Sequence, residues 1–396
     1  MNDILIVGAG PVGAVCALAL HQQGIVARVL EAQPEDARAD TRTLALSHGS
    51  RLILDRLGVW DKLAEVTPIT RIHISQRGAL GVARLSAEDL GVPALGYVLP
   101  YAGLTAVLKQ ALREAGIAVE YGVAVDRIES GADAATLHTA DGRTLSASLV
   151  AVADGGRGEN APTPKFERDY DQMAVVCDVQ TELPHAGQAY ERFTPEGPAA
   201  LLPHEGTPTV CGLEPVKDRM PKGHRYALVW TADSAAARGI AALPDSEFLA
   251  ALYRHFGGRQ GLFLHASPRK TFPLRLAYIG SEAADRVVRI GNAAQTLHPV
   301  AGQGFNIGLR DAWELASLCG DTAPAEIGNA AMLAAYASGR RADVLGGLGF
   351  TDFLVRTFSN DFAPLRHARG LGLLALEAFP PLKTFVARRM MFGARG

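Results

Sequence analysis

The sequence is poor in several features that identify large classes of protein. Its 396 residues include four cysteines, which stand far apart in the chain, and no two of them form a C-x-x-C pair. A disulfide framework or a structural zinc site is therefore not expected, and a reducing compartment suits the composition better. No H-x-x-x-H pattern or Cys/His cluster is present, so we expect no metal site. No internal repeat or low-complexity segment is present either.

The chain also lacks an excess of charge of one sign and any long apolar run. There are 39 Lys and Arg against 41 Asp and Glu, a net charge of −2, so nucleic-acid binding is not expected. No stretch of about 18 apolar residues occurs, and no transmembrane helix is expected. The N-terminal apolar run follows Asp3 and is interrupted by glycines, unlike a signal peptide. These features, with 48% apolar residues, favour a globular cytoplasmic enzyme.

A strand, a glycine turn, a helix and a second strand open the chain. Asp3–Val7 is an apolar run typical of a buried parallel strand, and residues 8–13 read G-A-G-P-V-G before an Ala-rich helical stretch. Gly24 is placed to end that helix in a left-handed conformation. Ile25–Leu30 is expected to be the second strand, with Glu31 at its end. The G-x-G-x-x-G spacing is that of a βαβ dinucleotide-binding fold.

The residues of this turn fit the demands of a pyrophosphate. Gly8 permits the tight turn, Gly10 lets the backbone approach the phosphates, and Gly13 allows close packing of helix on strand. The helix N-terminus offers N–H groups and a positive partial charge. Glu31 can accept hydrogen bonds from both hydroxyls of an adenosine ribose. A glycine-rich turn without a ligand is the alternative. The expected cofactor-binding residues are Gly8, Gly10, Pro11, Val12, Gly13 and Glu31.

A second glycine-rich loop leads into a helix far downstream. A strand at Arg286–Ile290 is followed by Gly291–Gln295, and then His298–Asn306 runs into a helix from Ile307 to about Cys319. Its N-terminus could hold a second anionic group. A flavin fits this arrangement, with its pyrophosphate on the first loop and its reduced ring, negative at N1/O2, on the amides of Gly302–Asn306.

Arg42 is a further candidate contact with the cofactor. It precedes a segment, Leu44–Leu57, that we expect to be helical, and it lies within reach of a ligand at the sheet edge. A surface arginine without such a function is the alternative.

The downstream loop resembles a known family signature. H-P-x-x-G-Q-G-x-N-x-G-x-x-D, here His298–Asp311, is similar to that of the ubiquinone-biosynthesis aromatic-ring hydroxylases, FAD-dependent monooxygenases related to para-hydroxybenzoate hydroxylase. The resemblance extends over essentially the whole chain, and Glu191–Pro203 resembles the family's substrate-domain strand. Gly291–Pro299 is most similar to the 2-octaprenyl-6-methoxyphenol hydroxylase branch.

The chain departs from the family pattern in three places. Asn292 and Gln295 stand where most relatives have Asp and His, although an Asn amide oxygen can still accept a hydrogen bond. Leu149–Gly155 resembles the family's "DG" segment, but Gly156-Arg157-Gly158 replaces the usual Ser-containing sequence after it, which weakens any inference about NAD(P)H docking. Pro100–Leu112 contains no Arg, where relatives often place one near the flavin.

The resemblance implies that FAD is bound and that a polyprenylated phenol is hydroxylated on its ring through a flavin C4a-hydroperoxide. O2 is then a substrate, and NAD(P)H or another donor is the reductant. His298 and Pro299 would shape the peroxide pocket through their backbone. Tyr190, Arg192 and His204 could meet the substrate hydroxyl or belong to ordinary sheet. The resemblance implies that Asn292 accepts a hydrogen bond from the flavin ribityl chain. The flavin-ring contacts expected from the second loop are Gly302, Gln303, Gly304, Phe305 and Asn306.

Two other functions stay open. One is an FAD-dependent hydroxylase or reductase of another aromatic substrate. The other is a flavin-stabilised scaffold within a biosynthetic assembly that contains other ubiquinone-biosynthesis proteins.

The expected fold is α/β: a Rossmann-like FAD-binding domain with an inserted, mostly antiparallel β-sheet substrate domain and a helical C-terminus. The FAD-binding domain would comprise 1–70, 96–165 and 280–345. The substrate domain would comprise 71–95 and 166–279, with strands at Met173–Thr181, Ala199–Leu202, Thr209–Leu213 and Tyr226–Thr231.

The C-terminal region, 346–396, combines basic and apolar residues. From Arg340 to Arg395 there are nine Arg or Lys against four Asp or Glu, interleaved with Leu, Phe and Met. Such a segment can lie on an anionic membrane surface, which would place the protein peripherally at the inner membrane. Packing on its own domain or on a partner subunit is the alternative, which is favoured slightly for Leu371–Phe379.

Overall fold

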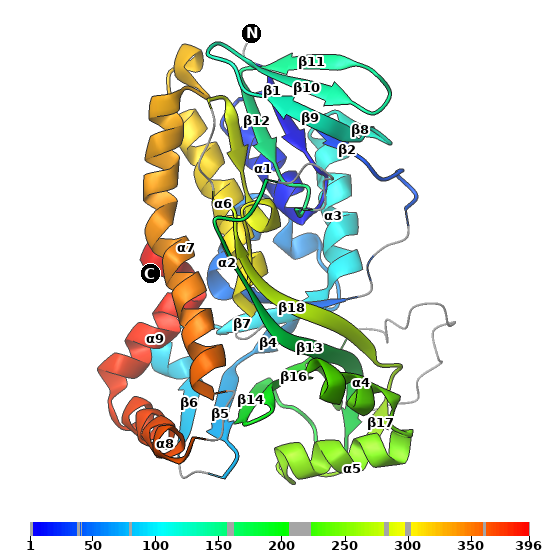
Figure 1. Cartoon of the computed structure of the whole chain (residues 1–396), viewed down its shortest axis with the longest axis vertical. Helices are drawn as coiled ribbons and strands as arrows, with labels where there is room; N and C mark the ends of the chain where they lie inside the picture. The colour runs from blue at the N-terminus through cyan, green and yellow to red at the C-terminus, as the bar shows by residue number, and fades with distance from the viewer. Residues whose placement is uncertain are drawn as a thin grey trace.

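A parallel sheet forms one end of the molecule and a larger antiparallel sheet forms the other (Figure 1). The computed structural model describes residues 3–37, 40, 42–78, 81–156, 162–205, 223–280, 285–297, 302–358 and 362–395. The parallel sheet consists, in spatial order, of β19 (Val287–Arg289), β12 (Leu149–Val152), β1 (Ile4–Val7), β2 (Ala27–Glu31) and β8 (Val119–Tyr121).

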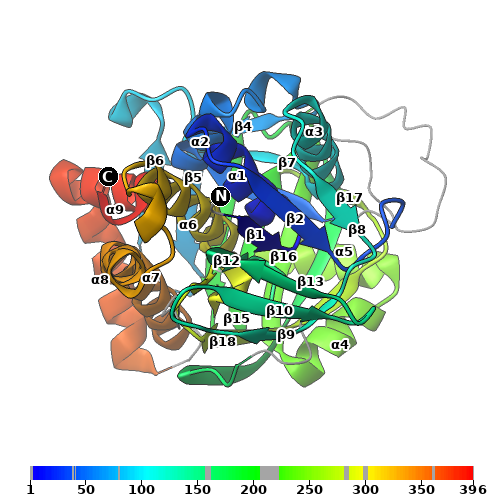
Figure 2. The ribbon, with the colours of Figure 1, turned by 90° about the horizontal axis from the view of Figure 1, so that it is seen from above.

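The two faces of the parallel sheet bury different layers, as the alternation of side chains along a strand requires. Ile4 and Ile6 of β1 pack toward α1 (Pro11–Gln22), α3 (Tyr101–Glu114) and α6 (Gln303–Gly320). Leu5 of the same strand packs toward a small antiparallel sheet. Figure 2 shows that sheet beside the parallel one. Its strands are β9 (Val125–Glu129), β10 (Ala135–Thr139) and β11 (Thr144–Ala147).

The prediction of a helix over Leu44–Leu57 is wrong in its first turn. Residues Thr43–Ser47 form β3, which pairs antiparallel with β7 (Gly96–Pro100) beside β4 (Thr67–Ile69). The helix α2 begins afterwards, at His48–Arg56, because Ser47 accepts a hydrogen bond from the N–H of Ser50 as its N-cap. Tertiary pairing with β7 thus overrides the local helical pattern.

The large sheet confirms the expected mostly antiparallel architecture. All its pairings are antiparallel except that of β14 with β5. The helices α4 (Ser234–Ala242) and α5 (Asp245–Phe256) cover one face. The strand expected at Thr209–Leu213 lies outside the described residues. In spatial order the strands are β20 (Gln295–Thr296), β18 (Lys270–Tyr278), β13 (Phe166–Thr181), β16 (Arg225–Asp233), β15 (Gly197–Pro203), β14 (Gln188–Thr194), β5 (Arg71–Gln76) and β6 (Val82–Ser86), with β17 (Phe263–Ala266) beside β13.

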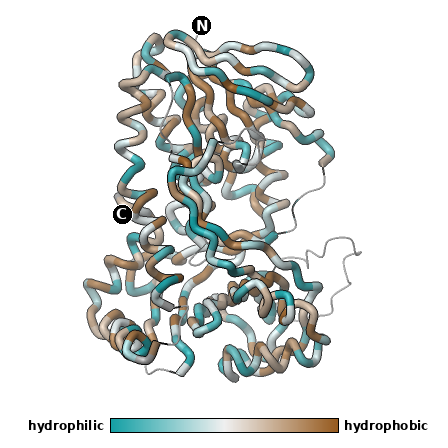
Figure 3. Tube along the Cα trace, viewed as in Figure 1, coloured by the Kyte–Doolittle hydropathy of each residue, from teal (hydrophilic) through white to brown (hydrophobic). Residues whose placement is uncertain are grey.

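The C-terminal region is helical, as expected. It comprises the end of α7 (Ala330–Phe358), then α8 (Ala363–Ala378) and α9 (Pro380–Phe392). The helix α7 packs on α6, α8 packs on β6, and α9 packs on α2. Figure 3 shows apolar residues concentrated in the strands of the parallel sheet and recurring along these helices. Within the described ranges no single helix is long and apolar enough to cross a membrane, whereas α8 and α9 pass that test as a pair bent by 98°.

Candidate functional site

The first glycine turn is packed so tightly that two of its residues have no room for a side chain. Gly8 has φ +105°, and a Cβ there would lie 2.6 Å from the carbonyl oxygen of Ala153. A Cβ on Gly13 would lie 1.9 Å from the carbonyl oxygen of Gly8. Gly10 differs, because in the described part of the chain a Cβ there would meet only the hydroxyl of Tyr101, at 4.0 Å. The turn is therefore closed toward the protein and open at Gly10.

The surroundings of this opening suit a diphosphate linked to a ribose. No side chain caps the N-terminus of α1, so the positive end of its dipole faces the opening. The Glu31 carboxylate, at the end of β2, accepts hydrogen bonds from the N–H of Ala9 at 2.6 Å and of Gln33 at 2.9 Å. Backbone amides thus hold an acceptor beside the turn. The residues present fit the phosphate and ribose of a dinucleotide.

The two glycine-rich segments, some 280 residues apart in sequence, touch one another through Val12. A Cβ on Gly308 of α6 would lie 2.9 Å from Cγ2 of Val12 and 3.1 Å from Cα of Gly291. A Cβ on Gly291 would lie 3.2 Å from Val12 as well. These contacts place the N-terminal half of α6 directly against α1. This packing agrees with the prediction that the two glycine-rich loops, although distant in sequence, contribute to one cofactor site.

The second loop is held in place through Asn306. Gly302 precedes α6 with φ +59°, and among the described residues no side chain caps the helix. The Asn306 amide donates to the carbonyls of Gly302 and Ala45, and its oxygen accepts from Ser47 N–H at 2.7 Å and Ser50 Oγ at 2.7 Å. The Asn306 side chain is thus committed to the protein, which leaves the uncapped backbone N–H groups to meet an anion.

Asp311, the last residue of the signature, fixes the preceding strand and turn. Its carboxylate accepts from the N–H of Gly291 at 3.0 Å and from Nε2 of Gln295 at 2.7 Å. Its other oxygen pairs with Arg340 at 2.8 Å. Gln295, one of the departures from the family pattern, therefore supplies a buried bond between the loop and α6.

The other residues predicted to bind the cofactor have environments that do not by themselves indicate a cofactor contact. The Arg42 guanidinium is paired with Asp40 at 2.7 Å and lies 5.6 Å from the Tyr101 ring centre. Asn292 is exposed within the turn that carries Gly291, and Phe305 packs against the main core. A Cβ on Gly304 would lie 3.8 Å from Cβ of Leu297, with no other described residue within 4 Å. His298 and Pro299 lie outside the described residues, and their function stays a prediction.

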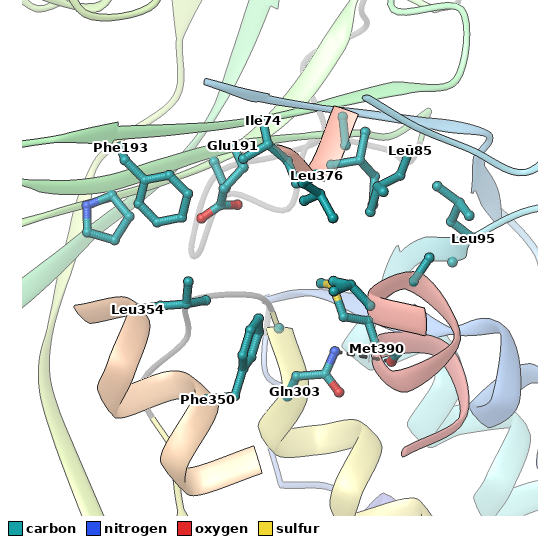
Figure 4. A pocket seen from close by; sticks show the side chains of 18 of the residues that line it. Ile74, Leu85, Leu95, Glu191, Phe193, Gln303, Phe350, Leu354, Leu376 and Met390 are labelled. Carbon is teal, nitrogen blue, oxygen red and sulfur yellow. Dashed lines mark hydrogen bonds between the residues drawn. The ribbon is translucent and has the colours of Figure 1, made fainter. Parts of the chain in front are cut away.

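A cavity of about 560 Å³ extends from the second loop between the large sheet and the C-terminal helices (Figure 4). It begins at Gly302, Gln303 and Asn306 and is lined mainly by aliphatic and aromatic side chains. The Gln303 amide donates to the carbonyl of Met390 at its edge. Lining side chains on several elements include Ile74, Leu85, Phe193, Phe350, Leu354 and Leu376. The cavity suits a large apolar ligand whose reacting end lies near α6.

Glu191 is the functional candidate that the sequence analysis missed as a site residue. It lies on β14 with its carboxylate directed into this cavity (Figure 4). Burial raises the pKa of the Glu191 carboxyl to about 8. The sequence signal that could have identified Glu191 is its position in the E-R-F segment, residues 191–193. In a strand, Glu191 and Phe193 share one face, and Tyr190 and Arg192 share the other.

Of the three residues proposed for the substrate hydroxyl, Tyr190 alone lines the cavity. The Tyr190 ring packs against Tyr226 and His73, on the face that α4 and α5 cover. Arg192 donates to Oγ of Ser75, and the buried His204 lies 3.1 Å from Asp178. Neither Arg192 nor His204 lines the cavity.

Comparisons with known proteins agree with this geometry. Residues 1–344 match the model of a family described as an FAD binding domain. The chain is 35% identical to the ubiquinone hydroxylase UbiL of Rhodospirillum rubrum, over 98% of this chain and 89% of that protein. It is 29% identical to the 3-demethoxyubiquinol 3-hydroxylase of Escherichia coli, over 96% of each.

Solved structures share the fold at lower identity. HpxO of Klebsiella pneumoniae, complexed with FAD and uric acid, gives a TM-score of 0.72 at 20% identity and covers 100% of this chain and 98% of that one. The p-nitrophenol 4-monooxygenase PnpA of Pseudomonas putida gives 0.74 at 18% identity over the full length of both. The expected α/β fold, a Rossmann-like domain with a mostly antiparallel sheet and a helical C-terminus, is confirmed.

Proposed function

The chain belongs to the FAD binding domain family, and from that premise we propose that it is an FAD-dependent monooxygenase that hydroxylates the ring of a polyprenylated phenol in ubiquinone biosynthesis. The observation that carries the proposal is the apolar cavity that reaches the second glycine loop. A long prenyl tail needs such a surface, and a flavin ring at the loop would meet the phenol at its end.

The chain's own residues would hold FAD at its two ends. Gly10 and the N-terminus of α1 would receive the pyrophosphate, and Glu31 would accept from the ribose hydroxyls. The uncapped backbone at Gly302–Asn306 would face the flavin ring. When bound and reduced, FAD would supply the electrons that activate O2. We also propose the domain division given above: an FAD-binding domain of residues 1–70, 96–165 and 280–345, and a substrate domain of residues 71–95 and 166–279.

The protein's part in the reaction is to orient the phenol ring and to exclude water from it. Phe193 and Leu354 project into the cavity from opposite sides. A cavity with so few polar groups lets little water reach the reacting atoms. No protein nucleophile is needed, because an electron-rich ring is itself the nucleophile.

Turnover should depend on the length of the prenyl tail. We expect the FAD-loaded protein to hydroxylate a farnesylated phenol with a kcat/KM at least 100-fold above that of the tail-less phenol, since each buried CH2 contributes about 0.8 kcal/mol to binding. Product analysis with both substrates, at equal O2 and reductant, measures the ratio. Equal efficiency on the tail-less phenol would favour a hydroxylase of small aromatics. Tight FAD binding without oxidation of either compound would favour the scaffold function.

We further propose that α8 and α9 contact the membrane peripherally. More than half of the exposed large apolar side chains among the described residues lie between 345 and 385, including Leu371 (67% exposed), Phe379 (62%) and Phe385 (66%). Arg388 is exposed beside them, although Arg340 and Arg369 are buried and add no surface charge. The inner faces of α8 and α9 line the cavity, so packing on the protein accounts only for those faces.

Charge on this surface should weaken binding to anionic vesicles. We expect the double variant Leu371→Glu/Phe385→Glu to bind phosphatidylglycerol-containing vesicles at least tenfold more weakly, because two apolar contacts are lost and two negative charges added. Vesicle co-sedimentation measures this. The matched control is Leu262→Glu/Leu264→Glu, which charges two leucines exposed elsewhere, by 53% and 51%. Equal binding by both double variants would contradict membrane contact through this surface.

A further inference from the structure

Glu191 is an ionisable group in an otherwise apolar compartment. The aliphatic and aromatic side chains named above surround it, with Phe193 on the same strand and Leu354 of α7 across the cavity (Figure 4). No hydrogen bond or ion pair engages its carboxylate within the part of the chain that the structure describes. A carboxyl group in such a place costs stability unless a ligand uses it.

The other charged side chain that lines the cavity among the described residues is Arg369 of α8. Arg369 donates to the carbonyl of Thr357 and is buried, and no interaction between it and Glu191 is present. Burial alone, with no charged neighbour, accounts for the raised pKa of Glu191. The carboxyl group is therefore available to a ligand in the cavity.

We propose that Glu191 is the hydroxyl-recognition site for the phenol: its carboxylate accepts the phenolic hydrogen bond and takes the proton as the ring reacts. This inference rests on the proposed function. The phenol O–H bond breaks, an O–H bond forms on the Glu191 carboxyl, and the electron pair stays on the phenolate oxygen, which makes the ring more nucleophilic. The carboxyl returns the proton to the product hydroxyl, so Glu191 is regenerated.

The acidity of Glu191 suits this task. An ordinary glutamate is about five to six pKa units more acidic than a phenol and accepts its proton poorly. Burial narrows that gap, because the pKa of Glu191 is raised to about 8. At pH values near 8 a large share of the carboxyl groups is still ionised and able to act as a base.

A pair of probes isolates the hydroxyl contact: a farnesylated phenol and its methyl ether, titrated into the FAD-loaded protein. We expect the wild-type protein to bind the phenol at least tenfold more tightly than the ether, since a hydrogen bond to a charged group has about that worth. Glu191→Leu should abolish the preference. Leu354→Ala, which alters the apolar wall, should weaken both ligands alike.

The pH dependence supplies a second readout. The kcat/KM of the wild-type protein should rise with pH through an apparent pKa near 8. The Glu191→Gln variant should not show this rise, and its kcat should be about 100-fold lower than that of the wild type.

In the protein without ligand, the stability lost by burying the ionised carboxylate grows as pH rises from 4.5 toward 8, because the pKa of Glu191 is raised on folding. Glu191→Gln should therefore raise the melting temperature more at pH 8.5 than at pH 5.

The outcomes separate the inference from the function on which it rests. A wild-type protein that hydroxylates the farnesylated phenol, with Glu191→Leu retaining the preference for phenol over ether, overturns the inference alone. A Glu191→Gln variant whose kcat/KM still rises with pH as in the wild type also overturns the inference alone. A wild-type protein that binds neither probe overturns the proposed function and the inference together.

Discussion

Valine at position 10 is expected to leave the fold intact and to weaken FAD binding about 10- to 100-fold. Gly10 has φ −62° and ψ 172°, a conformation open to any residue, and a Cβ there meets no protein atom closer than 4.0 Å. The space above it is where the proposal puts the pyrophosphate. Crowding of that kind costs about 1–3 kcal/mol, and each 1.4 kcal/mol is tenfold in affinity.

The control for this variant is Gly103→Ala. Gly103 lies in α3 with free space around a Cβ, so alanine there should leave FAD affinity unchanged and favour the helix by up to about 1 kcal/mol. Gly10→Val should itself cost no more than about 1 kcal/mol in unfolding free energy. Thermal melts without FAD and the flavin retained on purification check both statements. Full flavin retention in Gly10→Val would show that the turn does not hold the phosphates.

Replacing Arg340 by methionine is expected to lower the free energy of unfolding by about 3–5 kcal/mol. Arg340 is 1% exposed and pairs with Asp311 and Asp343 at 2.8 Å and with Glu314 at 3.0 Å. Removing one partner of a buried ion pair leaves the other charges uncompensated, and that loss exceeds the worth of the pair itself. Urea unfolding followed by circular dichroism measures the difference.

The neighbouring arginine provides the comparison. Arg341 is exposed on the same helix, and Arg341→Met should change the unfolding free energy by no more than about 0.5 kcal/mol. Because Asp311 also holds Gly291 and Gln295, Arg340→Met should reduce FAD retention as well. Equal stability of the two variants would contradict the structural importance given to this network.

The first site could be predicted from the sequence because its rules are local. Gly8, Gly13 and Gly24 occupy positions where backbone conformation or close packing excludes a side chain, and such glycines leave a readable spacing. Glu31 follows from the same spacing. The second loop is recognisable from its sequence as a helix N-terminus, and the family signature assigns both loops to one cofactor.

The substrate site could not be predicted in the same way, since it depends on tertiary pairing. Whether Glu191 or Arg192 faces the cavity is decided by which face of β14 the helices cover, and a one-residue change in register would exchange them. The strand β3 depends on its pairing with β7, and the bonds of Asp311 to Gln295 and Arg340 join residues from three segments. The count of nine basic residues from Arg340 to Arg395 exceeds the number that reach the surface, because Arg340 and Arg369 are buried.

A titration of the FAD-free protein with FAD, followed by flavin absorbance and heat of binding, tests the central claim most directly. The account predicts uptake of one FAD per chain by the wild-type protein and by Gly103→Ala, with the affinity of Gly10→Val reduced at least tenfold. A wild-type chain that takes up no FAD would contradict it, and so would a Gly10→Val chain that binds FAD as tightly as the wild type.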